Sequence, residues 1–155
     1  MRTAALMAVL MVAGCGTQAA HEPASAEMPV ASEPVADTAM AKLDGTEWRF
    51  VEVAGTPVPA AVTATLRIRD GRISGRAGCN SFGAKYLVQA DGKGSFSQIM
   101  STKMACIAPA GAMDVEHRIF EALPRVSRMD LRGGELALLD GAGKPLARLE
   151  PAGGS

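Results

Sequence analysis

Aromatic side chains are scarce in this chain. They make up 4% of its 155 residues, with a single Trp and a single Tyr. A core built with few large rings must be small and aliphatic, so the length allows one modest domain with appended segments. Such a domain gains a large share of its stability from any covalent cross-link that it carries.

Net charge is also absent, because 16 Lys and Arg residues balance 16 Asp and Glu residues. Proteins that bind nucleic acid or anionic lipid usually carry an excess of basic residues. The balance therefore provides no indication of a nucleic-acid partner and no electrostatic signature of anionic lipid.

The sequence lacks an apolar run of the length that a membrane-spanning helix needs, about 20 residues. The run Ala4–Ala13 is much shorter, follows the basic Arg2 and leads into small residues before Cys15. This arrangement is typical of an export signal. The order Val12-Ala13-Gly14-Cys15 is similar to the lipobox of bacterial lipoprotein signals, which implies cleavage before Cys15 and attachment of a lipid to it. An ordinary secretory signal that is cleaved nearby is the alternative.

On this interpretation residues 1–14 are a signal peptide. Residues 15–42 are then a lipidated N-terminus and a disordered tether rich in Ala, Pro and Glu. Such a tether reaches roughly 25 to 30 Å from a membrane surface. We expect a lipid-anchored protein of the bacterial cell envelope. Gly16 stands in place of the aspartate linked to inner-membrane retention, which favours the outer membrane with the domain facing the periplasm.

The cysteine count is low and even once the lipid is considered. Of three cysteines, Cys15 is assigned to the lipid, which leaves Cys79 and Cys106. Two cysteines in an oxidising compartment are expected to form a disulfide. The bridge would close a loop of roughly 27 residues and stabilise the fold by about 3 kcal/mol.

Short alternating runs predict a mainly antiparallel β domain. Trp48 and Phe50 share one face of the first run. The segment Gly75–Tyr86, rich in Gly and Asn, predicts a tight turn between strands. The expected strands cover residues 46–53, 65–69, 72–75, 86–89, 95–100, 126–132, 135–139 and 145–150, with turns at Asp70-Gly71 and at 91–94.

One helix is predicted over Ala110–Leu123, between two prolines. Val115 and Ile119 lie on its apolar arc, and Glu116 falls within the same arc. A carboxylate that faces a core needs a partner, so we expect Glu116 to accept hydrogen bonds from backbone N–H groups or to pair with a base. A catalytic acid in a pocket is the functional alternative.

Several short motifs occur in an order that resembles the META domain of HslJ-type heat-shock lipoproteins. They are Trp48, Gly78-Cys79-Asn80, Phe82, Tyr86, Met104 within Thr102–Cys106, Met113 and Glu116. Over residues 43–151 the resemblance implies an α+β fold, with a mainly antiparallel, partly barrel-like sheet and one packed helix. It implies no established enzymatic activity and relates the chain to stress response and drug tolerance of the bacterial envelope. Residues 152–155 are expected to be a frayed tail.

The same residues can be tested against catalytic and metal sites. Cys79, Asn80 and His117 are the residue types of a papain-like site, but a bridged cysteine has no thiolate to attack with. Two cysteines and His117 also lack the short spacing of zinc ligands. We therefore expect no catalytic residue, no metal and no cofactor, and the sequence identifies no small-molecule substrate.

Methionines are frequent in the second half of the chain. Met100, Met104, Met113 and Met129 are predicted to fill gaps in the small core, with Ile99 and Ile107. Any that are exposed would instead form an adaptable surface for a protein partner in the envelope.

The expected function is therefore binding or stress protection in the periplasm. The alternative is an inhibitor of a protease or lysozyme that presents the turn Gly78–Tyr86 to its target.

Overall fold

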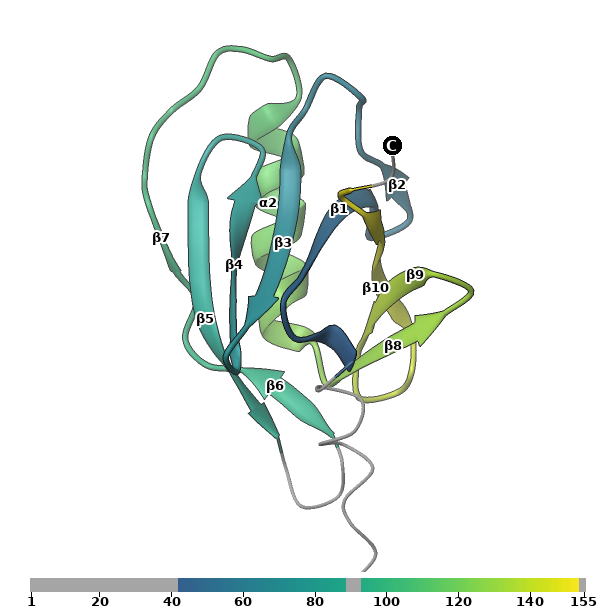
Figure 1. Cartoon of the computed structure of the whole chain (residues 1–155). Helices are drawn as coiled ribbons and strands as arrows, with labels where there is room; N and C mark the ends of the chain where they lie inside the picture. The colour runs from purple at the N-terminus through teal and green to yellow at the C-terminus, as the bar shows by residue number, and fades with distance from the viewer. Residues whose placement is uncertain (1–41, 89–92, 154–155) are drawn as a thin grey trace, which may run out of the picture. The chain divides into compact units, whose positions relative to one another are not determined.

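The computed structural model describes residues 42–88 and 93–153, which form one antiparallel sheet and a packed helix (Figure 1). Ten strands run in the order β6-β5-β4-β3-β1-β10-β9-β8, with β2 on β1 and β7 on β5. This confirms the predicted fold class. The elements are β1 (Thr46–Val53), β2 (Thr56–Pro57), β3 (Ala64–Arg69), β4 (Arg72–Ala77), β5 (Ser81–Val88), β6 (Gly94–Phe96), β7 (Met100–Ser101), α2 (Ala112–Ala122), the 3-10 turn η1 (Leu123–Arg125), β8 (Arg128–Arg132), β9 (Glu135–Leu139) and β10 (Pro145–Pro151).

Several predictions fall outside the described residues. They are the signal peptide at 1–14, the lipid on Cys15, the tether up to residue 41, the last residue of the strand at 86–89, the first two residues of the turn at 91–94, and residues 154–155 of the tail. In the part of the chain that is described, no helix has both the length and the apolar character to cross a bilayer.

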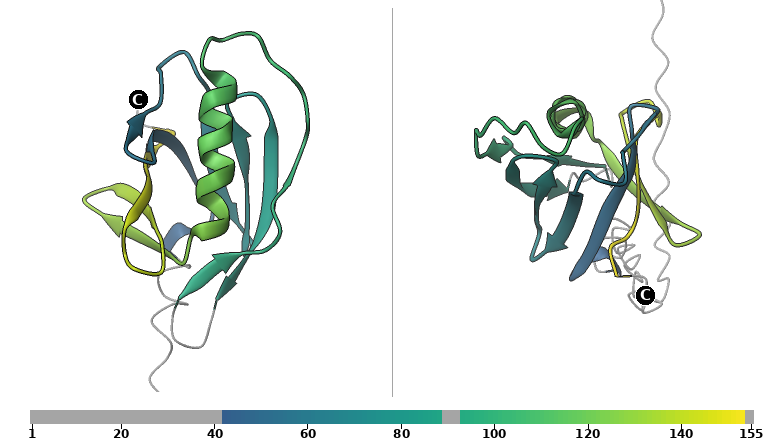
Figure 2. Two further views of the ribbon diagram at one scale, coloured as in Figure 1. Left: turned by 180° about the vertical axis from the view of Figure 1, so that it is seen from behind. Right: turned by 90° about the horizontal axis from the view of Figure 1, so that it is seen from above.

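The sheet curls into a nearly closed barrel. The N–H of Gly94, at the start of β6, donates a hydrogen bond to the carbonyl oxygen of Ser127, just before β8, at 2.8 Å. This contact joins the two ends of the strand order. Helix α2 lies along one side of the curled sheet, where it packs against β4 and β1 (Figure 2).

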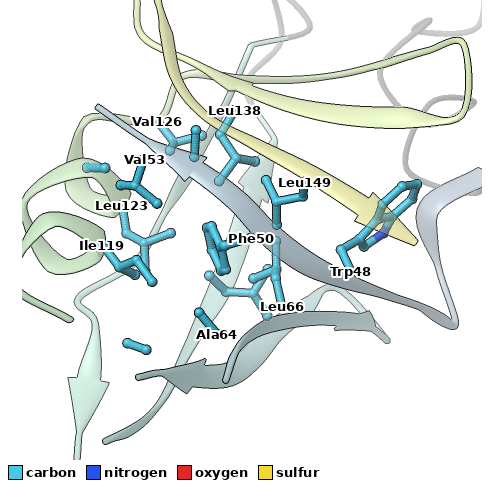
Figure 3. Close-up of a cluster of buried hydrophobic side chains, with 14 of the residues drawn as sticks. Trp48, Phe50, Val53, Ala64, Leu66, Ile119, Leu123, Val126, Leu138 and Leu149 are labelled. Atoms are coloured by element: carbon cyan, nitrogen blue, oxygen red, sulfur yellow. The ribbon is translucent and has the colours of Figure 1, made fainter. Parts of the chain in front are cut away.

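The core lies between the sheet and α2. Trp48 and Phe50 of β1 are 5% and 2% exposed, which confirms that they share a buried face. Side chains from the sheet and the helix meet around Phe50, among them Leu66, Leu149 and Ile119 (Figure 3). Removing a ring of this kind from a core costs about 3–5 kcal/mol.

Helix α2 forms close to where the prolines placed it. Gly111 precedes its first residue with a left-handed φ of 82°, and Pro124 lies in the short 3-10 turn that follows. Proline has no N–H to continue the α-helical hydrogen bonds, so the helix ends there. Val115 and Ile119 are fully buried, as the apolar arc predicted.

The predicted tight turn at Gly75–Tyr86 is wrong in extent. Its first three residues belong to β4 and its last six to β5, so only Gly78–Asn80 forms the turn. The N–H of Ala77 donates to the carbonyl oxygen of Asn80 at 2.8 Å, which closes the chain tightly. Gly75 serves strand packing instead, because a Cβ there would lie 1.9 Å from the carbonyl oxygen of Thr65 in β3.

The predicted strand at 95–100 is divided. The N–H of Ser97 donates to the carbonyl oxygen of Lys85 at 2.9 Å, and the Ser97 hydroxyl accepts from the N–H of Lys85 at 2.9 Å. These two bonds occupy the pairing groups of Lys85 between β6 and β7. Both short strands therefore pair with β5 but are separated by the connection 97–99.

The three C-terminal strands follow the predicted meander. Beyond them, the N–H of Ala152 donates to the carbonyl oxygen of Glu47 at 2.9 Å. The first residue of the expected frayed tail is thus hydrogen-bonded to the sheet.

Candidate functional site

Asn80 is the centre of a buried hydrogen-bond network that joins three segments of the chain. It lies in the turn between β4 and β5 and is 1% exposed. Its side-chain oxygen accepts hydrogen bonds from the N–H of Met104 at 2.7 Å and from the hydroxyl of Thr102 at 2.8 Å. Its side-chain nitrogen donates to the carbonyl oxygen of Met104 at 2.9 Å. The loop after β7 is therefore attached to the turn through one side chain.

Glu116 completes this network from α2. The backbone N–H of Asn80 donates to Glu116 Oε2 at 2.7 Å, and the Asn80 amide donates to Oε1 at 2.9 Å and to Oε2 at 3.0 Å. Glu116 is 8% exposed, so this confirms the prediction of a carboxylate that faces the core and accepts from a backbone N–H. Both of its oxygens are occupied by Asn80, which argues against the alternative of a catalytic acid.

Gly78 allows α2 to approach the turn. Its φ is 90°, and a Cβ at this position would lie 2.4 Å from the carbonyl oxygen of Ala112 in the first turn of α2. A side chain there is excluded both by the backbone conformation and by the contact. The glycine thus places Asn80 within reach of Glu116.

A disulfide between Cys79 and Cys106 holds the same turn to the same loop, as predicted. The two Cα atoms are 5.8 Å apart. The Arg76 guanidinium donates to the carbonyl oxygen of Cys79 at 3.1 Å, which satisfies a further polar group of the turn. We call Gly78, Cys79, Asn80, Met104, Cys106 and Glu116 the clasp.

The clasp offers little for catalysis. The Cys79 sulfur is bonded to Cys106 and cannot act as a thiolate. His117 lies on the exposed side of α2, with its Nε2 at 3.2 Å from Glu121 Oε1. Within residues 42–88 and 93–153, no group of three His, Cys, Asp or Glu side chains could hold a metal ion. We interpret the clasp as architecture that holds the loop, the turn and the helix together.

Comparison with known proteins identifies the fold. A family model for the META domain matches residues 41–153. The chain belongs to the META domain family. This confirms the resemblance that the motifs carried.

Solved structures support the same conclusion. An NMR structure of a protein from Burkholderia xenovorans has a TM-score of 0.59 and 26% identity, and the match covers 86% of this chain and 99% of that one. A crystal structure of a DUF4847 family protein from Bacteroides vulgatus has a TM-score of 0.53 and 12% identity, with 72% and 96% of the two chains covered. At that identity it shows the fold alone. A search of curated proteins finds no match.

The three aromatic motif residues of this META domain lie outside the clasp. Phe82 contacts Phe120 of α2 edge to face, with ring centroids 6.1 Å apart. Tyr86 packs beside Phe96, and burial raises the pKa of its phenol above the ordinary value. The Trp48 indole N–H donates to the hydroxyl of Thr46 at 2.7 Å. These residues support the core of the META domain rather than one common site.

The methionine prediction is wrong for three of the four residues. Met129 is 8% exposed and does fill the core, but Met100, Met104 and Met113 are 75%, 56% and 40% exposed. Ile107 is fully exposed as well. The clasp holds the backbone of Met104 against Asn80, and Met100 lies in the short strand β7, which pairs with the edge of β5.

A groove of about 500 Å³ lies beside the connection between β6 and β7 and the end of α2. The described lining is mostly apolar and contains no charged side chain. It consists of Phe96, Ser97, Gln98, Ile99, Ser101, Phe120 and Pro124. Sequence reasoning missed this groove, because it exists only where the predicted strand at 95–100 divides.

The turn proposed for an inhibitor is not available to a target enzyme. Gly78, Cys79, Asn80 and Phe82 are all buried, and their side chains or backbone contact α2 and the loop. Inserting this turn into an enzyme would first require the clasp to open. The geometry therefore argues against that alternative.

Charges on the outer surface of the META domain are unevenly paired. On β1, β9 and β10, Arg49 lies 3.2 Å from Glu150, and Arg148 lies 3.3 Å from Glu52 and 3.1 Å from Glu135. Hydrogen bonds to Glu52 and then to Glu135 raise the pKa of Arg148. The sequence analysis found no charge signal, because the total charge does not depend on where residues meet in the sheet.

Proposed function

We propose that this META domain is a non-enzymatic protein of the bacterial envelope that acts through binding or stress protection in the periplasm. A lipid on Cys15 anchors it, with the outer membrane as its location and the domain facing the periplasm. The order Val12-Ala13-Gly14-Cys15 supports the anchor, since it is similar to a lipobox. The disulfide between Cys79 and Cys106 is the observation that carries the proposal, because such bonds persist in oxidising compartments.

The satisfied polar groups of the clasp support a role without catalysis. The buried polar atoms of Asn80 and Glu116 form hydrogen bonds with each other, and Asn80 also bonds the backbone of the loop. A general acid or nucleophile needs a group that is available to a substrate. The exposed methionines next to the clasp instead provide an adaptable surface for a protein partner.

Mass spectrometry of the protein purified from membranes tests the anchor. We expect a chain that begins at Cys15 and carries the mass of a diacylglyceryl group and an N-linked acyl chain. The variant Cys15→Ser is the matched control and should carry no lipid and retain residues 1–14. A mature wild-type protein with an unmodified Cys15 would contradict the proposal.

Thiol labelling of the same preparation tests the compartment. Without reductant, Cys79 and Cys106 should not react, and after reduction in denaturant both should react. Two reactive thiols in freshly isolated protein would mean that the domain is kept in a reducing space.

A further inference from the structure

The adjacent strands β3, β4 and β5 contain basic residues and no acidic ones. Their cations are exposed, and Figure 1 shows these strands in front of α2, so their outer surface points away from the helix. We call this surface the basic face. Its members are Arg69 in β3, Arg72 and Arg76 in β4, and Lys85 in β5. Arg67 of β3 lies beside them but is paired with Glu47 of β1 at 2.7 Å.

Three of these cations lie in one row across the strands. Arg69 is opposite Arg72 in the pairing of β3 with β4, and Arg72 is opposite Lys85 in the pairing of β4 with β5. Neighbouring strands are about 4.8 Å apart, and like charges directly opposite each other destabilise a sheet. An external anion that neutralises the row would remove this repulsion.

The row has little compensation inside the domain. Arg69 has Asp70 at 3.5 Å, but their side chains are 72% and 80% exposed, so water screens the pair. Arg72 and Lys85 form no ion pair with any residue that the structure describes. Among the described residues, no carboxylate therefore neutralises these two adjacent cations.

Exposed apolar side chains lie on the same face. Met100 of β7 is opposite Gly83 of β5, and Leu87 follows Lys85 by two positions in β5. Residues two apart on a strand, and residues opposite each other, point to the same side of a sheet. Met100 is 75% exposed and Leu87 is 48% exposed. Cations with exposed apolar side chains among them are typical of surfaces that bind the membrane interface.

The N-terminal part of the chain enters the domain beside this row. The N–H of Asp70, at the tip of the β3–β4 hairpin, donates to Asp44 Oδ1 at 2.6 Å. The N–H of Gly45 donates to the carbonyl oxygen of Ile68 at 2.9 Å. Asp44 and Gly45 thus join the domain next to Arg69 and Arg72, so a lipid anchor on the preceding tether would keep this face within roughly 25 to 30 Å of the bilayer.

We propose that the basic face docks on a membrane surface that contains anionic phospholipid. Arg69, Arg72 and Lys85 contact the phosphate groups, and Met100 and Leu87 enter the boundary between headgroups and acyl chains. This inference rests on the proposed lipid anchor, and it adds an orientation of the domain on the membrane. The loop that carries Met104 and Ile107 stays at the edge of the docked surface.

An acidic segment of the chain itself is the alternative ligand for the basic face. Residues 16–41 contain four acidic residues, Glu22, Glu27, Glu33 and Asp37, and no Lys or Arg. Their charge is complementary to the row, but they offer no counterpart for the exposed Met100 and Leu87. The membrane accounts for both the charged and the apolar side chains, and the acidic segment becomes an outcome of the test.

Vesicle flotation with the mature chain, residues 15–155 carrying Cys15→Ser, measures docking without the lipid and without the apolar signal segment. We expect binding to vesicles of phosphatidylcholine with 30% phosphatidylglycerol, about tenfold or more weaker binding to pure phosphatidylcholine, and loss of binding at 0.5 M salt. The further change Arg72→Gln with Lys85→Gln should weaken binding about 25-fold, at about fivefold per charge. Met100→Ser should weaken it roughly fivefold at every salt concentration at which the parent chain still binds.

The matched control removes the same charge elsewhere. Arg128→Gln with Lys144→Gln changes two exposed cations at β8 and the turn before β10 and should alter binding less than twofold. Thermal unfolding of every variant should show that each is folded. Equal losses in both double variants, or equal binding to both kinds of vesicle, would overturn the proposal.

Three outcomes distinguish this proposal from the alternatives. If the chain binds anionic vesicles only after the four acidic residues at 22–37 are changed to Gln or Asn, its own segment covers the face and the membrane proposal is wrong. A lipidated Cys15 with no vesicle binding would overturn the docking alone. Vesicle binding by a chain whose Cys15 is unmodified in cells would overturn the anchor and leave the docking surface in place.

Discussion

The clasp and the basic face of this domain differ in whether their charged groups have partners. In the clasp, the buried carboxylate of Glu116 receives three hydrogen bonds from Asn80, so its burial is fully compensated. On the basic face, Arg72 and Lys85 lie side by side without an acidic partner among the described residues. The first arrangement stabilises the fold, and the second makes the fold slightly less stable than it could be. Because the cations of the basic face lack compensation and the carboxylate of the clasp does not, we expect an anionic partner to bind at the basic face.

The two halves of the sheet also differ in how the charges on their outer surfaces are paired. The outer surface of β1, β9 and β10 alternates Arg with Glu, whereas β3, β4 and β5 have Arg and Lys alone. Both surfaces face the same solvent. Solvation alone therefore does not explain the missing carboxylates.

The largest effect on stability is expected at the clasp. Glu116→Ala should lower the free energy of unfolding by about 4 kcal/mol, because the N–H of Asn80 and its amide lose their acceptor in a buried site. Urea unfolding monitored by circular dichroism measures the change. Glu121→Ala, on the exposed side of the same helix, is the control and should stay within about 0.5 kcal/mol of the wild type. Equal effects of the two variants would remove the distinction between buried and exposed charge.

The next largest effect on stability is expected from removing the disulfide of the clasp while its hydrogen bonds remain. Cys79→Ser with Cys106→Ser should lower the free energy of unfolding by about 3 kcal/mol, chiefly by freeing the unfolded chain. Because Asn80 still holds Met104, the folded state should keep its circular dichroism spectrum. If the double serine variant loses no stability, the hydrogen bonds alone hold the loop.

The smallest effects should differ in sign between the two halves of the sheet. Arg148→Gln removes the partner of both Glu52 and Glu135 and should lower the melting temperature. Arg72→Gln relieves the repulsion with Arg69 and Lys85 and should raise the free energy of unfolding by about 0.3 kcal/mol. Differential scanning calorimetry at low salt resolves the two. Changes of the same sign would contradict the view that only one half is electrostatically matched.

Salt offers a further way to sharpen the contrast. Raising ionic strength screens exposed charges, so it should reduce the stability difference between Arg72→Gln and the wild type towards zero above about 0.5 M salt. The Glu116→Ala difference should remain, because buried groups are screened much less. A clasp effect that disappears in salt would mean that Glu116 is not buried in solution.

Local patterns were sufficient to predict much of this fold. The alternation in residues 46–53 and the turn Asp70-Gly71 depend on neighbours in sequence, and both are present. Glu116 was predicted to face inward from the helical period, which also needs only local information. The cysteine pair could be predicted because only one partner remained for Cys79.

Features that depend on long-range pairing could not be predicted. The exposure of Met100 follows from its position opposite Gly83, and the division of the strand at 95–100 follows from bonds between Ser97 and Lys85. The row of Arg69, Arg72 and Lys85 needs the register of three strands. A sum over the whole chain cannot show it, because the acidic residues lie elsewhere.

An NMR titration of the mature chain, residues 15–155 carrying Cys15→Ser, with bicelles that contain phosphatidylglycerol tests the central claim most directly. We predict that the amide signals of β3, β4, β5 and Met100 broaden or shift first, while those of β9 and β10 and of the clasp around Asn80 stay unchanged. Perturbation confined to β9 and β10, or to the loop around Ile107, would contradict the account.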